Sequence, residues 1–114
     1  MLIKIIKQKI SRPDWETIAQ ETFGDMVKGV VDVRQKIVAL GGELHADAEE
    51  ILLKEGSQQS NLWGFNIYVN KAKEDRIEYT SLINIRPKDG NRDREVKNQP
   101  LRDTIKKIID ELVE

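Results

Sequence analysis

The spacing of hydrophobic residues changes several times along the chain, and each change predicts a new element. Residues 2–6 form a short apolar run rich in isoleucine, which is typical of a strand. Helical spacing follows, with a capping hydroxyl at Ser11 and a terminating glycine at Gly24. In order, the pattern predicts a strand at 2–6, a helix between 11 and 24, strands at 26–33 and 37–41, a helix at 46–55, strands at 62–69 and 76–86, and a final helix from residue 100.

The clearest strand pattern lies at residues 76–86. Apolar and polar residues alternate there, and Pro87, which cannot donate to a strand ladder, ends the run. One face of this predicted strand holds Ile77, Tyr79, Ser81, Ile83 and Ile85. Residues 87–99 then form a charged stretch without a period, and a loop of this length in a compact domain is usually functional or disordered.

The order of these elements predicts an α+β domain. Two local hairpins and an N-terminal strand give an antiparallel or mixed sheet of about five strands, and we expect about three helices packed on one side of it. The chain has 114 residues and no linker or internal repeat, so we interpret residues 1–114 as a single domain.

Composition narrows the classes of function. The 19 basic and 20 acidic residues nearly cancel, so net charge does not favour nucleic acid or an anionic membrane as a partner. The absence of cysteine excludes disulfides and thiolate chemistry. The N-terminal apolar run is interrupted by Lys4 and is too short for a signal peptide or a membrane span. We therefore expect a soluble, cytoplasmic protein.

Five segments of the chain form a recognisable combination. They are VVDV (30–33), GGELHAD (41–47), LWG (62–64), INIRP (83–87) and GNR (90–92). This combination resembles an uncharacterised family of small prokaryotic proteins that is known only as a domain of unknown function. The resemblance covers nearly the whole chain, and it implies no activity. It does imply that these segments, which are far apart in the sequence, belong to one site.

The strongest candidate chemistry follows the glycine pair at 41–42. His45, the only histidine, lies between Glu43 and Asp47, and in an extended segment this spacing places all three side chains on one side. The group could bind a divalent metal, or His45 could act as a general base held by Asp47 or by Asp32. The alternative is a helix start at which these side chains cap first-turn amides. The sequence identifies neither a metal nor a cofactor.

A second polar group is expected at the end of the last predicted strand. Its arginines offer planar guanidinium groups that suit phosphate or carboxylate, and Gly90 lets a ligand approach the backbone. The candidate binding residues are Asn84, Arg86, Asn91 and Arg92, with Arg94 beside them. The alternative is a solvated loop whose arginines pair with neighbouring acids. Four residues on polar strand faces could also line a pocket with this loop: Asn66, Tyr68, Asn84 and Arg86.

Three functional hypotheses follow. The first is a ligand- or protein-binding or regulatory module that recognises a small anionic ligand or a protein partner and forms a homo-oligomer, with a dimer expected. The second is a metal-assisted or acid–base hydrolase of a phosphate or ester. Its catalytic residues would be His45, Asp47, Glu43 and Asp32, and Arg86 and Arg92 would hold the anion of the substrate in the same composite site. The third is a purely structural subunit. We rank the binding module first.

Overall fold

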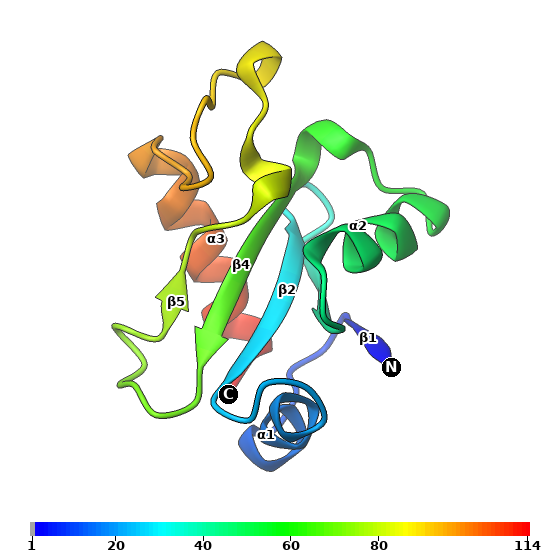
Figure 1. The fold of residues 1–114 in the computed structure, drawn as a ribbon, viewed down its shortest axis with the longest axis vertical. Helices are drawn as coiled ribbons and strands as arrows, with labels where there is room; N and C mark the ends of the chain where they lie inside the picture. The colour runs from blue at the N-terminus through cyan, green and yellow to red at the C-terminus, as the bar shows by residue number, and fades with distance from the viewer. Residues whose placement is uncertain (1) are drawn as a thin grey trace.

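The computed structural model describes residues 2–114 and contains one five-stranded antiparallel sheet, in the order β1-β3-β2-β4-β5 (Figure 1). The strands are β1 (Ile3–Ile6), β2 (Met26–Asp32), β3 (Ile37–Gly41), β4 (Leu62–Tyr68) and β5 (Ile77–Glu78). The helices are α1 (Arg12–Gln20), α2 (His45–Lys54) and α3 (Gln99–Leu112), with short 3₁₀ turns η1 (Gln59–Asn61), η2 (Leu82–Asn84) and η3 (Pro87–Asp89). The predicted α+β class, five strands and three helices are confirmed.

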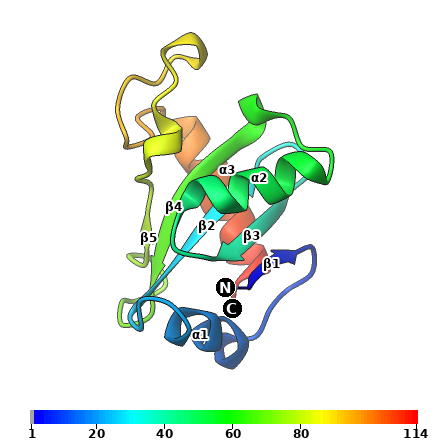
Figure 2. The ribbon, with the colours of Figure 1, turned by 45° about the vertical axis from the view of Figure 1, so that its right-hand side comes forward.

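Helices cover both faces of the sheet, so the prediction that they pack on one side is wrong. Helix α2 lies on one face, whereas α1 and α3 contribute to the apolar cluster on the other (Figures 1 and 2). The reason is visible in β2, where the neighbours Val30 and Val31 point to opposite faces and are both fully buried. A strand that is buried on both sides is continuously apolar, as residues 37–40 also are.

Local signals in the first half of the chain give the structure expected of them. Ser11 caps α1 by accepting a hydrogen bond from the backbone N–H of Asp14, and Gly24 has a positive φ of 84° just after the helix. Strands β2 and β3 form the expected hairpin, with the pairing Asp32↔Ile37 next to the turn. These features depend on contacts between near neighbours, which a sequence pattern can encode.

The predicted strand at 76–86 is mostly wrong. Strand β5 covers only Ile77–Glu78, and the chain then folds into η2, where the Ser81 hydroxyl accepts from the backbone N–H of Ile83. The side chain of Asn84 replaces the missing strand. Its Oδ1 accepts from the Gly64 N–H at 2.8 Å and its Nδ2 donates to the Gly64 carbonyl at 3.0 Å. An amide side chain thus satisfies β4 as a strand neighbour would.

The charged stretch after η2 is held by a second amide, that of Asn91. Its Nδ2 donates to the carbonyl oxygens of Asn84, Asp93 and Glu95, and its Oδ1 accepts from the N–H of Lys97. The chain also forms isolated bridges between residues 86 and 91 and between residues 80 and 95. The segment is therefore ordered by its own polar side chains, although it contains no long regular element.

Candidate functional site

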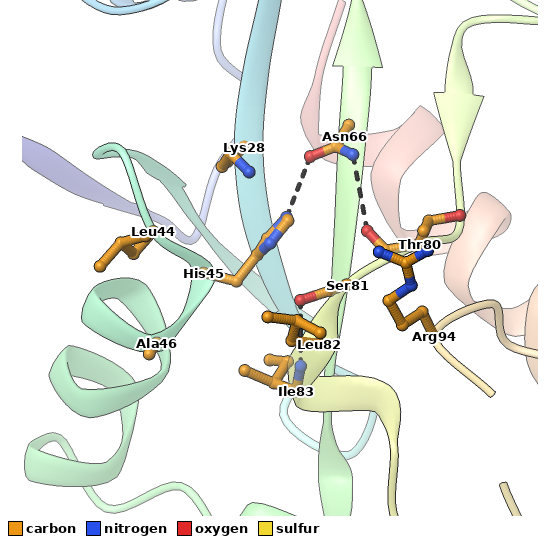
Figure 3. A pocket seen from close by; sticks show the side chains of 10 residues that line it. All are labelled: Lys28, Leu44, His45, Ala46, Asn66, Thr80, Ser81, Leu82, Ile83 and Arg94. Carbon is orange, nitrogen blue, oxygen red and sulfur yellow. Dashed lines mark hydrogen bonds between the residues drawn. The ribbon is translucent and has the colours of Figure 1, made fainter. Parts of the chain in front are cut away.

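A pocket of about 470 Å³ opens where the start of α2 faces β4 and η2 (Figure 3). Its polar lining comes from several elements: Lys28 on β2, His45 on α2, Asn66 on β4, and Thr80, Ser81 and Arg94 from the segments around η2. Its apolar lining comes from Leu44, Ala46, Leu82 and Ile83. The β2–β4 register pairs Lys28 with Asn66, so these two side chains lie on the same face of the sheet.

His45 forms the centre of this pocket and is only 8% exposed. Its Nε2 lies 2.9 Å from the carbonyl oxygen of Phe65 and 3.0 Å from Oδ1 of Asn66. Because a carbonyl oxygen only accepts, Nε2 carries the ring proton and donates it. Burial lowers the pKa of His45, with a further contribution from Lys28, although the hydrogen bonds to Phe65 and Asn66 oppose that shift. The ring is therefore neutral at pH 7, and its Nδ1 is unprotonated.

The orientation of the Asn66 amide is fixed from its other side. Its Nδ2 donates to a carboxylate oxygen of Glu78 at 2.8 Å, so its Oδ1 faces His45. The same carboxylate oxygen accepts from the hydroxyl of Tyr68 at 3.1 Å. A continuous hydrogen-bonded chain thus runs from Tyr68 through Glu78 and Asn66 to the imidazole, as Figure 3 shows in part. This chain fixes the ring position and its tautomer.

Two cations line the pocket without an acidic partner. The ion pairs formed within residues 2–114 involve neither Lys28 nor Arg94. The backbone at Leu44 provides the N-cap of α2, and no side chain there accepts from the first-turn amides. Uncapped amides and the positive end of the helix dipole add to the two cationic side chains. The pocket therefore favours negative charge.

The rim of the pocket is apolar and exposed. Leu44 is 60% exposed and Leu82 is 71% exposed, and Ile83 also lines the pocket. Large apolar side chains beside convergent polar groups are typical of a site for an organic ligand. The lining therefore combines an anion-attracting floor with a surface for a hydrocarbon group.

The residues predicted to act with His45 are not gathered around it. Asp32 pairs with Leu62 on β4, four residues along β2 from Lys28, which is about 13 Å in a strand. Its carboxylate is buried and accepts from the backbone N–H groups of Arg34 and Gln35, and from two side chains. Burial would raise the pKa of Asp32, but these hydrogen bonds outweigh it and hold the pKa below its usual value. Asp32 therefore organises the hairpin turn.

Glu43 and Asp47 flank His45 in the sequence, but their side chains are exposed and form no part of the pocket lining. Neither caps α2 by a side-chain hydrogen bond, so the predicted alternative of a capping role for Asp47 is also not found. Across residues 2–114, no three His, Asp or Glu side chains come close enough together to hold a metal ion.

The four predicted binding residues also lie outside the pocket. Asn84 and Asn91 are buried and use their amides to hold the backbone, as described above. Arg86 stacks on Trp63, with its guanidinium carbon 3.9 Å from the ring centroid, and donates to the carbonyl of Gln59 at 2.6 Å. The side chain of Arg92 is exposed. The composite site of His45 with Arg86 and Arg92 is therefore not assembled.

Arg94, rather than Arg86 or Arg92, is the arginine that lines the pocket with His45. The two-residue shift between Arg92 and Arg94 depends on the folded path of the loop, which no local pattern encodes. Lys28 was missed entirely by the sequence reasoning. Its signal is a single charge within the valine-rich strand at 26–33, and that charge becomes informative only once β2 is known to pair with β4.

No helix within residues 2–114 has the length and apolar character needed to cross a membrane. A comparison with curated proteins finds no match, and a comparison with solved structures finds none either. A comparison with protein families matches residues 4–112 to a family described as "Protein of unknown function (DUF5674)". Because this match spans almost the entire chain, the chain belongs to the family of proteins of unknown function DUF5674.

Proposed function

We propose that this protein is a binding module and that the pocket between α2 and η2 takes a small organic anion. The observation that carries the proposal is the placement of Lys28 and Arg94 in one pocket with the uncapped start of α2. Within residues 2–114, neither cation takes part in an ion pair. A cation left unpaired beside an apolar wall is stabilised when a carboxylate or similar group binds there.

The position of the apolar groups supports an organic rather than an inorganic anion. Leu44, Leu82 and Ile83 line the same pocket as the cations, so a hydrocarbon group attached to the anion would cover surface that is otherwise in water. A volume of about 470 Å³ accommodates a compound of metabolite size. Figure 3 shows both kinds of side chain around the imidazole of His45.

The test uses 4-methylpentanoate, a carboxylate with a branched apolar tail, titrated into the protein by calorimetry and by NMR. We expect a dissociation constant of about 1 mM or tighter. This corresponds to a binding free energy of about −4 kcal/mol, which a ligand of this size can reach in a favourable site. Replacing Arg94 removes a charge-assisted hydrogen bond, so Arg94→Gln should weaken binding by about tenfold or more.

The chain offers a matched control two residues away. Arg92→Gln changes the same charge on the same loop, but the exposed Arg92 does not line the pocket, so affinity should not change. Both variants should retain the unfolding midpoint of the parent protein in urea, because neither side chain forms an ion pair in the described chain. Equal loss of affinity in the two variants would mean that only net charge matters, and the pocket would be abandoned as the site.

A further inference from the structure

The tautomer of His45 has a consequence for the chemistry of the ligand. Nε2 donates to the Phe65 carbonyl, whose oxygen can only accept, so moving the ring proton to Nδ1 would leave an unprotonated Nε2 facing an acceptor oxygen. Asn66 reinforces the same tautomer, because Glu78 holds its Nδ2 and directs its Oδ1 at the ring. Nδ1 is therefore fixed as a hydrogen-bond acceptor.

This acceptor has no partner within residues 2–114, since both hydrogen bonds of the ring involve Nε2. Nδ1 is also not enclosed by the protein. The buried side-chain atoms without partners in that range belong to Trp15, Glu49, Arg76 and Arg86. His45 itself is more than nine-tenths buried and lines the pocket, so the open side of its ring faces the space that a ligand would fill.

Resting on the proposed function, we propose that the ligand is an organic anion that also carries a neutral hydrogen-bond donor, and that this donor binds Nδ1 of His45. A 2-hydroxycarboxylate is the simplest compound of this class. Its carboxylate would lie with Lys28 and Arg94, its hydroxyl would donate to Nδ1, and its hydrocarbon tail would contact Leu44 and Leu82. A cationic donor such as an ammonium group fits less well, because Lys28 and Arg94 already place positive charge there.

The experiment compares compounds that differ by one group. The probes are 4-methylpentanoate, both enantiomers of 2-hydroxy-4-methylpentanoate, and leucine, each titrated into protein labelled with ¹⁵N at histidine. The chain contains a single histidine, so the two ring nitrogens report on this site alone. In the free protein at pH 7, we expect the spectrum of a neutral ring that is protonated at Nε2.

On binding, one enantiomer of the hydroxy acid should bind about fivefold more tightly than 4-methylpentanoate, which corresponds to one added hydrogen bond. The Nδ1 resonance should shift upfield with the hydroxy acid and stay in place with 4-methylpentanoate. Leucine should bind more weakly than the hydroxy acid. These shifts separate a hydrogen bond to His45 from any general change in affinity.

The outcomes distinguish this inference from the function on which it rests. If neither acid binds, the proposed function fails. If 4-methylpentanoate binds and the hydroxyl adds no affinity, or adds affinity without moving the Nδ1 resonance, the anion pocket stands and the role of His45 is overturned. A free protein whose ring is protonated at Nδ1 would overturn it before any ligand is added.

Discussion

The replacement of a strand by the side chain of Asn84 makes a quantitative prediction. Asn84 is fully buried, and its amide accepts from the Gly64 N–H, donates to the Gly64 carbonyl, and donates to the Arg94 carbonyl at 3.1 Å. In Asn84→Ala, both backbone groups of the buried Gly64 lose these side-chain partners, whereas the Arg94 carbonyl still accepts from the backbone N–H of Ser81 at 3.1 Å. Each buried unsatisfied group costs roughly 1–3 kcal/mol, so the free energy of unfolding should fall by about 3 kcal/mol.

The variant Asn84→Asp tests the same contact by replacing the amide with a carboxyl group that can ionise. Its carboxylate can still accept from the Gly64 N–H, but it faces the carbonyl oxygens of Gly64 and Arg94, to which Nδ2 now donates. Ionisation is therefore disfavoured in the folded state, and the pKa of the new Asp should be raised above its unfolded value. The stability deficit relative to the parent protein should be small below pH 4, grow as the pH rises from there, and level off above the folded pKa.

Urea denaturation followed by tryptophan fluorescence measures both variants, because Trp15 and Trp63 are buried. Asn70 provides the matched control, since it is exposed and Asn70→Ala or Asn70→Asp should change stability by less than about 0.5 kcal/mol. If Asn84→Ala lowered the free energy of unfolding no more than the control does, the amide of Asn84 would not be acting as a strand partner. A deficit of Asn84→Asp that did not depend on pH would refute the electrostatic part of the reasoning.

Three further predictions concern other parts of the structure. Arg76 is 1% exposed and donates to two C-terminal carbonyls, so Arg76→Gln should lower the free energy of unfolding by about 3 kcal/mol, whereas the same change at the exposed Arg92 should not. Burial lowers the pKa of His45, so the unfolded chain takes up the proton first. Stability should therefore fall as the pH drops below about 6.5, and an NMR titration giving a pKa at or above that value would contradict the assignment. A Cβ at Gly29 would lie 2.4 Å from the ring of Phe65, so Gly29→Ala should lower stability by about 2 kcal/mol in urea; an unchanged midpoint would be inconsistent with this packing.

The parts of the fold that the sequence predicts are those decided by near neighbours. The cap at Ser11 and the hairpin between β2 and β3 need only residues within a few positions of one another. The prediction of a strand at 76–86 is mostly wrong because its pairing depends on β4, which is distant in the sequence. Gly64 leaves no room for a side chain on β4, since a Cβ there would lie 2.4 Å from Cβ of Ser81. The segment that contains Ser81 therefore passes close to β4, and the side chain of Asn84 forms the hydrogen bonds to Gly64 that a neighbouring strand would form. The alternation of apolar and polar residues at 76–86 does not indicate that a side chain takes the place of a strand there.

The candidate site also contains residues that the sequence indicates and residues that depend on the folded structure. The composition of residues 41–47 correctly directs attention to His45, which is central to the pocket. Its partners come from β2, β4 and the loop after η2, so they depend on the sheet order and on the path of that loop. Of the four residues that the sequence predicts on polar strand faces around a pocket, Asn66 lines the pocket that contains His45, whereas Tyr68, Asn84 and Arg86 do not. The choice of Arg94 rather than Arg92 could not be predicted from the sequence, since both are exposed arginines on one loop.

The partners of His45 also bear on the choice between binding and acid–base chemistry. A general base gains strength when a carboxylate lies against the ring nitrogen opposite its reacting nitrogen, because that carboxylate stabilises the imidazolium. Here, Nε2 contacts a backbone carbonyl and a neutral amide, and the carboxylate of Glu78 is one residue further away, behind Asn66. Burial and Lys28 both lower the pKa of His45. A ring held neutral in one tautomer is a poor proton shuttle but a well-directed acceptor, and this supports recognition rather than proton transfer as its task.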